Sequence, residues 1–409
     1  MGMKVTNKYS GYSFVLLAGI GVSNIGDWIY LIAFNLIILD MTGSPLAVAV
    51  LYLLKPLAAL FTNIWAGSLI DRLNKRSLMV WLDIIRAILV GMLPLCTSLS
   101  VIYSVVLLIN MASAVFQPTS LSYITKLIPS ADRNTFNSLR SLVDSGAFLI
   151  GPAVAGLLFM VSSPTTAVYL NGLSFLCSAL LTILMPNLES GWRIKAGEKL
   201  LAFSVVRTDW KIVKEFSRHH HYVVLIYFLF SCVIVMTAAI DSLEAAFAKD
   251  VLRLTNQSYG LLVSIAGGGT IVGSVINTLI SRRSNPFILM GSGSLFLSIG
   301  YLCFAFSDSF LIAALGFFVL SFSLAFANTG FYTFIQNNIP VQVMGRFSSI
   351  YGLVEAVLVI LLTAAFGLLA HLVSIQLIVI AGASLLFILT IILCYQCQRS
   401  SVASQSSVG

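Results

Sequence analysis

The chain has 409 residues, of which 58% are hydrophobic and only 9% are charged, and its mean hydropathy is +0.98. A soluble protein of this length needs more polar surface than this composition provides, so the composition indicates an integral membrane protein. The formal net charge of +8 would suggest nucleic acid as a partner of a soluble protein. Here most lysines and arginines fall in alternate loops, which is typical of a membrane protein, and we expect no nucleic-acid partner.

Long apolar runs follow one another along the chain. They lie at 14–39, 45–70, 77–97, 100–125, 137–161, 165–186, 222–247, 257–281, 286–306, 309–335, 345–369 and 374–396. The runs are about 20 residues or longer without strict alternation, so they predict membrane-spanning helices rather than barrel strands. The first run is too long for a signal-peptide core. The predicted fold class is therefore an all-α membrane protein with twelve transmembrane helices.

Only the connection near the middle of the chain is long. The predicted division is a six-helix bundle at 1–186, an amphipathic cytoplasmic linker at 187–221, a second six-helix bundle at 222–396 and a disordered Ser-rich tail at 397–409. Most loop cations lie on one side of the predicted membrane, whereas the opposite loops hold only Lys249 and Arg253. Both termini and the linker are therefore expected in the cytoplasm.

The linker mixes cations with aromatic residues such as Trp192 and Trp210, which predicts a helix on an anionic membrane surface. The last three residues of the predicted linker are His219 to His221. Three adjacent residues on a helix point in different directions, which favours a solvated cluster over a metal site. The pair Cys394 and Cys397 lacks the further ligands of a zinc site, so buried free thiols are expected.

The stretch from Gly67 to Arg76 joins the second and third predicted helices. Gly67 removes side-chain bulk where helices could approach, and Asp71 and Arg72 lie where the apolar run ends. Asn74 tolerates a left-handed turn, and the following cations, including Arg76, favour a cytoplasmic loop. A weaker repeat, Gly273 to Asn277 followed by two arginines, ends the eighth predicted helix.

This stretch resembles the signature loop Gly-x-x-x-Asp-Arg-x-Gly-Arg-Arg of the Major Facilitator Superfamily. In the fifth run, Gly151, Pro152 and Gly156 resemble the glycine–proline pattern carried by the family's proton-driven exporters. Such a pattern combines close helix packing with a bend. The resemblance implies two pseudo-symmetric bundles that rock about a central cavity.

Further stretches resemble the branch that contains macrolide efflux proteins and the enterobactin exporter. They are Gly26-Asp27-Trp28, Asp83-x-x-Arg86, Phe116-Gln117-Pro118 and Gly345-Arg346-Phe347. The resemblance implies an antiporter in a bacterial cytoplasmic membrane, with a monomer as the family's usual state and with small molecules, protons and lipid as partners. It implies no cofactor beyond the proton gradient. The fourth helix lacks the arginine of many drug–proton antiporters, so their coupling scheme does not transfer.

Ionisable residues at membrane depth each cost about 2.5–3.5 kcal/mol on insertion scales, so they need a partner or water. Asp83 and Arg86 share a helix face and are expected to neutralise each other. Those without an obvious partner are predicted to carry protons: Glu355, Asp241, Glu244 and Asp27. The pair Asp241 and Glu244 has an alternative, which is solvation near the outer membrane face.

The predicted substrate cavity is lined by polar and aromatic residues of several helices. They are Asn24, Trp28, Lys55, Gln117, Asn328, Tyr332 and Gln336. Residues predicted to act in the gate or in conformational change are Gly67, Asp71, Arg72, Arg76, Asp144, Gly151, Pro152, Gly156 and Arg346. Asp71 is expected to bind the start of the eleventh helix, around Gly345 to Ser349, and Asp144 to pair with Arg140.

The sequence therefore predicts a proton-coupled exporter of amphipathic molecules, with an importer or a lipid or siderophore exporter of the same fold as the alternative. A membrane enzyme is disfavoured because the sequence lacks a His-x-x-x-His box, a nucleophile elbow and a phosphate-binding loop. The sequence does not specify the substrate.

Overall fold

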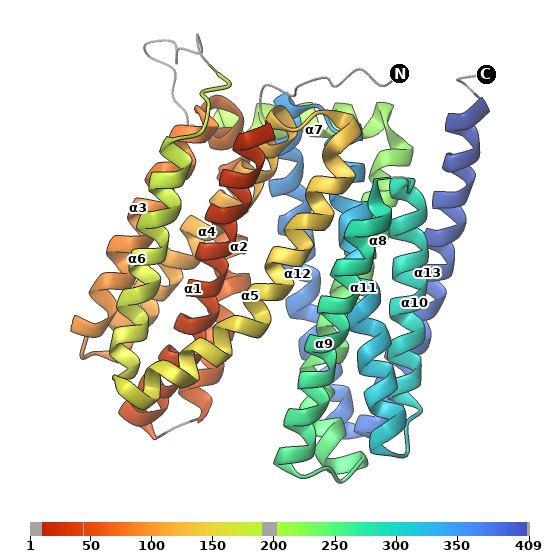
Figure 1. The fold of residues 1–409 in the computed structure, drawn as a ribbon. Coiled ribbons are helices and arrows are strands. Elements are labelled where there is room, and N and C mark those ends of the chain that lie inside the picture. Colours follow the sequence, from red (N-terminus) through yellow and green to blue (C-terminus); the bar gives the residue numbers. More distant parts are fainter. Residues whose placement is uncertain (1–9, 44, 190–202, 283, 407–409) are drawn as a thin grey trace. The chain divides into compact units, whose positions relative to one another are not determined.

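The computed structural model describes residues 10–43, 45–189, 203–282 and 284–406, where the regular elements are all helical (Figure 1). The long helices are α1 Ser10–Thr42, α2 Pro45–Arg72, α3 Lys75–Met92, α4 Leu99–Leu127, α5 Arg133–Val161, α6 Pro164–Ile183, α7 Phe203–His219, α8 His221–Ala246, α9 Asn256–Ser281, α10 Pro286–Ala305, α11 Phe310–Asn338, α12 Val341–Leu372 and α13 Ile375–Ser406. The short ones are η1 Leu93–Leu95, η2 Ser130–Asp132 and the π-helix η3 Phe247–Val251. Within the described residues, twelve helices are long and apolar enough to cross a membrane, which confirms the twelve predicted spans.

Short polar residues fix the starts of several helices. Asn74 precedes α3, and its side chain accepts a hydrogen bond from the Ser77 N–H at 3.0 Å. Its backbone is extended, with φ −65° and ψ 115°, so the predicted left-handed turn at Asn74 is wrong because the residue serves as a helix cap. Among the described residues, left-handed backbone occurs at Gly43, between α1 and α2, where φ is +63°, and at Arg253, where φ is 54°.

The chain divides into two compact units. Unit 1 comprises Met1–Ser130, Gly146–Phe216 and Pro340–Leu353, and unit 2 comprises Ala131–Ser145, Ser217–Ile339 and Val354–Gly409. Compared with the predicted bundles at 1–186 and 222–396, two segments are exchanged: the start of α5 belongs to unit 2, and the start of α12 belongs to unit 1. Both exchanges arise from contacts between residues of opposite sequence halves.

Each unit is built from helices packed side by side. In unit 1, α1 and α3 pack on α6, and α4 packs on α2 and α3. In unit 2, α11 packs on α9 and α10, and α13 packs on α8 and α10. Small residues set the spacing: a Cβ added to Gly300 of α10 would lie 2.5 Å from the backbone nitrogen of Leu320 in α11.

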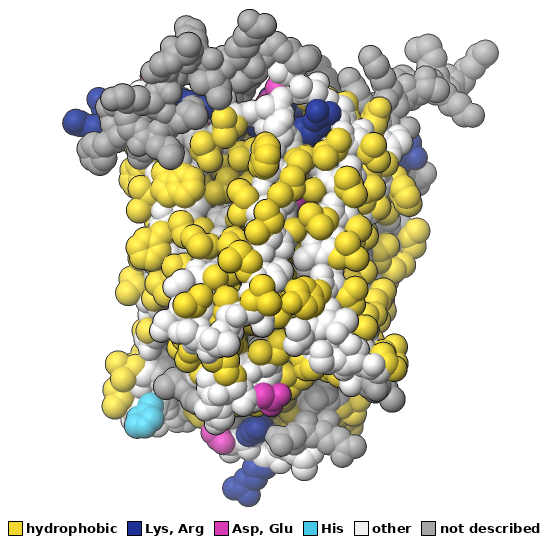
Figure 2. Space-filling view, turned by 90° about the vertical axis from the view of Figure 1, so that its left-hand side faces the viewer, with side chains coloured by type: hydrophobic (Ala, Val, Ile, Leu, Met, Phe, Trp, Pro, Cys, Tyr) yellow, Lys and Arg dark blue, Asp and Glu magenta, His cyan; other side chains and the backbone are white. Residues whose placement is uncertain are grey.

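The outer surface is apolar, as expected for helices in lipid. Large side chains such as Phe14, Leu157 and Leu311 are more than half exposed. Figure 2 shows one face of the molecule, on which hydrophobic side chains cover the middle and charged side chains gather toward the two ends. This distribution fits a band of lipid contact between two polar surfaces.

Two predictions about the segments outside the bundles need correction. The tail predicted to be disordered from 397 is helical to Ser406, because Ser-rich sequence without glycine or proline continues α13 and Cys397 is buried against its neighbours. The linker contains the predicted helix, α7, but one face of α7 is buried in protein: Asp209 and Val213 are 2% and 3% exposed. Trp192 and its neighbours at 190–202 lie outside the described residues.

Candidate functional site

Two glycines let α2 and α12 cross in direct contact. A Cβ added to Gly67 would lie 2.5 Å from the Cα of Arg346, and one added to Gly345 would lie 2.5 Å from a carboxylate oxygen of Asp71. Both distances are far below van der Waals contact, so a side chain at either position would force the helices apart. Gly67 therefore has the close-packing role that the sequence predicts for it.

Asp71 lies at the end of α2 and is 6% exposed. Its Oδ1 accepts a hydrogen bond from the N–H of Gly345 at 3.0 Å, and its Oδ2 accepts one from the N–H of Arg346 at 3.2 Å. The predicted contact is therefore present. Because α12 begins at Val341 rather than at 345, these amides lie in the second turn of the helix. The hydrogen bonds therefore stabilise the carboxylate more than the helix dipole, which weakens beyond the first turn.

A second carboxylate, Asp209 of α7, joins this crossing. Arg72 donates hydrogen bonds to both of its oxygens, at 2.6 and 2.8 Å, and the Ser68 hydroxyl donates to Oδ2. The Nε of Arg346 lies 3.1 Å from Asp209 and 3.4 Å from Asp71, so one guanidinium is shared by two carboxylates. We call these four charged residues, Asp71, Arg72, Asp209 and Arg346, the α2–α12 charge cluster.

Glu189, at the start of the linker, is bound by two lysines. It accepts hydrogen bonds from the N–H and Nζ of Lys75, at 2.7 and 2.8 Å, and from the Nζ of Lys126 at 2.5 Å. Burial acts to raise the pKa of Glu189, but the hydrogen bonds from Lys126 and Lys75 outweigh it, so the pKa lies below the usual glutamate value. Arg76 donates to the carbonyl of Met185 at 2.8 Å. The side chains of Lys75 and Arg76 therefore contact the linker and the end of the first sequence half rather than α12.

The roles of Asp209 and Glu189 were not predicted from the sequence, which placed them among the charges of a membrane-surface segment. On α7, Asp209 shares a helix face with Val213 and Phe216 at the spacing i, i+4, i+7. A carboxylate in this apolar stripe was the available signal. The identity of its partners required the tertiary structure.

The start of α5 contacts α9 through neutral polar groups and α11 through neutral polar groups and Arg133, which donates to the carbonyl of Gln336 and the side chain of Asn337. Asn137 donates to the side chains of Gln336 and Thr333 at 2.8 and 2.9 Å, and the hydroxyls of Ser138 and Ser281 are 2.9 Å apart. Gln336 was predicted to line a substrate cavity. It is 3% exposed, and its amide takes part in this buried contact. That it lines a substrate cavity stays a prediction.

Three charged residues in the membrane-spanning helices of unit 1, Asp27, Asp83 and Arg86, lie near opposite charges. Asp83 and Arg86 form a buried ion pair, as predicted, and the guanidinium lies 4.2 Å from the ring centroid of Phe116. Asp27, a predicted proton carrier on α1, lies within electrostatic range of Arg86 and Lys55. Its charge is therefore partly balanced by cations.

The predicted proton carriers of unit 2 have different surroundings. Tyr301 of α10 donates to Asp241 at 2.7 Å, and Tyr259 of α9 donates to Glu244 at 2.9 Å. Asp241 is exposed, whereas Glu244 and Glu355 are half-buried. Among the described residues, the ion pairs include none of these three carboxylates.

The remaining predicted cavity residues differ in exposure. Lys55 and Gln117 are exposed, and Asn24, Trp28, Asn328 and Tyr332 are half-buried. The Arg140 guanidinium lies 5.3 Å from the ring centroid of Tyr332, and its Nε lies 3.9 Å from Asp144, which confirms the predicted pairing of Asp144. That these residues bind one substrate stays a prediction.

The glycine–proline pattern of α5 packs only in part. A Cβ at Gly151 would collide with the side chain of Trp28 on α1, and Pro152 lies inside the helix. At Gly156, nothing among the described residues would come within 4 Å of an added Cβ. Close packing is therefore present at Gly151 and not at Gly156.

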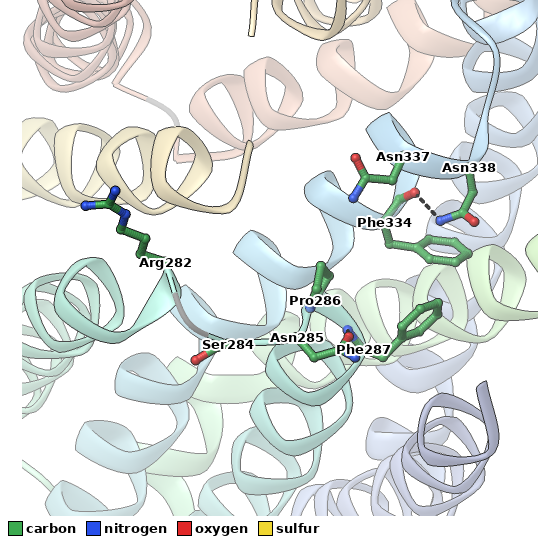
Figure 3. A pocket seen from close by; sticks show the side chains of 8 residues that line it. All are labelled: Arg282, Ser284, Asn285, Pro286, Phe287, Phe334, Asn337 and Asn338. Atoms are coloured by element: carbon green, nitrogen blue, oxygen red, sulfur yellow. Dashed lines mark hydrogen bonds between the residues drawn. The ribbon is translucent and has the colours of Figure 1, made fainter. Parts of the chain in front are cut away.

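A pocket of about 480 Å³ opens in unit 2 between the start of α10 and the end of α11 (Figure 3). Its lining residues are Arg282, Ser284, Asn285, Pro286, Phe287, Phe334, Asn337 and Asn338. None of them was predicted to bind substrate. Asn285 caps α10 by accepting from the Phe287 N–H at 2.9 Å, and Asn338 donates to the Phe334 carbonyl, so these amides have structural partners.

The twelve spans and the glycine-lined crossing agree with a comparison against protein families. Residues 16–364 match the family model described as Major Facilitator Superfamily. The chain belongs to the Major Facilitator Superfamily. It is a multi-pass membrane transporter, as the family, its relatives and its spans together indicate.

Relatives of known sequence include transporters and efflux proteins. The chain is 24% identical over 391 residues to an uncharacterized MFS-type transporter, YfiS of Bacillus subtilis (strain 168), covering 92% of this chain and 91% of YfiS. The multidrug efflux pump Tap of Mycolicibacterium fortuitum is 22% identical over 43% of this chain and 46% of Tap. The putative bacilysin exporter BacE of Bacillus subtilis (strain 168) is 32% identical over 28% of this chain and 29% of BacE.

The fold is also that of solved transporters. The crystal structure of the human organic anion transporter MFSD10 (TETRAN) matches with a TM-score of 0.75 and 14% identity, covering 95% of this chain and 99% of that one. At this identity the similarity shows the shared fold alone.

Proposed function

We propose that this transporter is a proton-coupled exporter, an antiporter that moves amphipathic small molecules out of the cell across a bacterial cytoplasmic membrane. The supporting observation is the set of carboxylates in unit 2, Asp241, Glu244 and Glu355, which lie in membrane-spanning helices outside the described ion pairs. A carboxylate in such a position can be neutralised by a proton, and reversible protonation is the chemistry of a proton carrier. No other cofactor is needed.

Export is supported by the names of two relatives and by a sequence pattern in α5. Two relatives that match parts of this chain are named as an efflux pump and a putative exporter. In addition, α5 carries the glycine–proline pattern associated with exporters. An importer, or an exporter of lipids or siderophores, is the alternative that the same fold allows.

In the proposed mechanism, residues 1–186 and 222–396 rock about the substrate, and the α2–α12 crossing closes the cytoplasmic side. Asp71 acts as a latch on this gate because its hydrogen bonds to Gly345 and Arg346 join the two sequence halves. Opening toward the cytoplasm must break them. Substrate and protons would then alternate at the carboxylates of the second half.

The test is transport in proteoliposomes under an imposed pH gradient, with a compound first identified by expressing the protein against a panel of dyes and antibiotics. Glu355→Gln, Asp241→Asn and Glu244→Gln are each expected to reduce gradient-driven transport severely while leaving expression intact, because neutral amides cannot carry the proton. Asp308→Asn, which changes an exposed loop carboxylate, is the matched control and should transport normally. Retention of gradient-driven transport by all three variants would contradict proton coupling at these residues.

A further inference from the structure

We infer that the linker helix α7 is a third component of the α2–α12 crossing, in which Asp209 is the positioning residue that holds Arg72 and Arg346 together. The inference rests on the proposed function in one respect, namely that this crossing acts as the gate. The inference adds α7 to the gate that α2 and α12 form.

Asp209 is buried and contacts several groups at once. Its side chain is 2% exposed, and it binds Arg72 through both oxygens, the Ser68 hydroxyl and the Arg346 guanidinium. A bidentate arginine–carboxylate contact fixes the orientation of both partners. Because Arg72 belongs to α2 and Arg346 to α12, the single carboxylate of Asp209 connects three helices.

Arg346 lies between Asp71 and Asp209. Its Nε lies at ion-pair distance from both Asp71 and Asp209, yet in the described part of the chain it forms no hydrogen bond. The Nε of Arg346 is therefore held between two carboxylates by charge rather than by a hydrogen bond to one of them. Two acids balance two arginines in this cluster, so removal of Asp209 leaves Arg72 and Arg346 with Asp71 alone, in a site where an unbalanced charge is unfavourable.

One face of α7 packs against the rest of the protein. Val213 is buried, and the ring of Phe216 lies edge-on to that of Phe347 in α12, with centroids 5.8 Å apart. The residues Arg207, Lys211 and Lys214 repeat at i, i+4 and i+7 on the roughly opposite face and are exposed. The helix thus has one docked face and one solvated face.

The two linker carboxylates differ in what they join. Glu189 binds Lys75 of α3 and Lys126 of α4, which belong to the same sequence half. Asp209 joins α2 of the first half to α12 of the second. If the halves separate on this side during transport, the contacts of Glu189 persist and the contact of Asp209 with Arg346 must break. Glu189 is therefore a permanent anchor of the linker, and Asp209 is its conditional contact.

The lowered pKa of Glu189 supports this assignment as an anchor. A carboxylate with a lowered pKa in the folded protein contributes stability above its usual pKa, and that contribution is lost as the pH falls through the lowered value. The ion pairs of Glu189 therefore remain intact at neutral pH and in mild acid. Changes of pH within the working range of a transporter do not release the linker at this end.

The experiment measures the labelling rate of a buried reporter cysteine in full-length protein in proteoliposomes. Ser349→Cys, in a background whose six native cysteines are replaced by alanine, serves as reporter because Ser349 is 2% exposed and its hydroxyl has no hydrogen-bond partner among the described residues. Asp209→Asn is expected to raise the labelling rate about tenfold, a shift within reach of one charge-assisted contact. Asp209→Glu, which keeps the charge, should raise it less. Glu189→Gln is the matched control and should stay within about twofold.

The outcomes separate the inference from the proposed gate. Asp71→Asn is measured in parallel. If Asp71→Asn raises the labelling rate and Asp209→Asn does not, or if Glu189→Gln raises it as much as Asp209→Asn, the role assigned to α7 is wrong. If Asp71→Asn itself leaves the rate unchanged while transport continues, the crossing is not the gate and the proposed mechanism fails first. Melting temperature and substrate affinity are recorded for every variant. A rise in labelling rate that is matched by a fall in melting temperature counts against the inference. If Asp209→Asn does not fold, Asp209→Glu is compared with the parent protein instead.

Discussion

At the scale of single residues, the missing side chain of Gly67 decides whether α2 and α12 can touch. The added Cβ of an alanine would meet the backbone of Arg346, which cannot rotate away as a flexible side chain could. The residue type is therefore specified by contact between backbones, and an alanine, although the better helix former, does not fit.

We expect Gly67→Ala to weaken the closed crossing by about 1–3 kcal/mol, the usual range for overpacking, which corresponds to a roughly five- to hundredfold shift of the equilibrium. The variant should be expressed but transport slowly, with faster labelling of the Ser349→Cys reporter. Gly91→Ala is the matched control, since nothing described lies within 4 Å of a Cβ at Gly91. Equal behaviour of the two variants would show that the crossing does not limit transport.

Residue-scale prediction from the sequence identified the charges in the apolar runs, but it found the partners of Asp71 and not those of Asp241 and Glu244. Asp71, Asp241 and Glu244 stand out because a carboxylate in an apolar run is costly. Their partners are distant in sequence: Tyr301 is 60 positions from Asp241. Helix periodicity relates only residues within a few turns, so it could not identify the tyrosine.

At the scale of helices, the two crossings between sequence halves use different chemistry. The α2–α12 crossing contains four charged residues, whereas α5 meets α9 through hydroxyls such as Ser145 and Ser274, which are 2.8 Å apart. The sequence repeat predicted Asn277 as the counterpart of Asp71. Asn277 instead donates to the Thr329 hydroxyl of α11 at 2.7 Å, because the amide is buried between α9 and α11. The repeat thus predicted the position and not the contact.

We expect Asp71→Asn to raise the accessibility of Ser349→Cys and to slow transport, while substrate affinity changes by no more than a few-fold. The charge-assisted hydrogen bonds that are lost are worth about 1.5–3 kcal/mol, which corresponds to a roughly ten- to hundredfold shift. Ser274→Ala, at the neutral crossing, is the comparison variant and should have the smaller effect, since it removes no charge. Unchanged accessibility together with lost binding in Asp71→Asn would place this residue in the substrate site instead.

At the scale of the whole molecule, hydropathy was sufficient for the spans because each helix in lipid must satisfy its own backbone and present an apolar surface. The composition of the two compact units could not be predicted in the same way. Residues 131–145 and 340–353 group with the opposite sequence half through side-chain contacts, and these leave no periodic signal in the sequence.

Membrane orientation gives a test of the whole assembly. We expect position 210 to face the cytoplasm, since the cations lie almost entirely on the side of the linker. Trp210 is 42% exposed, so Trp210→Cys in the cysteine-free background is accessible to a reagent once it reaches that side. An impermeant maleimide should label Arg253→Cys in intact cells and label Trp210→Cys only after the membrane is opened. Strong labelling at 210 in intact cells would reverse the assigned orientation.

The covalent connection of α7 to the first sequence half also affects how quickly the crossing can form again. Asp209 follows Glu189 by about 20 residues, so the second carboxylate remains tethered near Arg72 and Arg346 even when its own contacts are broken. Because the contact forms within one chain, its effective concentration does not depend on an encounter with a separate carboxylate partner. Closure is then an intramolecular step whose rate is independent of protein concentration, and a weak individual contact is sufficient to restore the closed arrangement after every cycle.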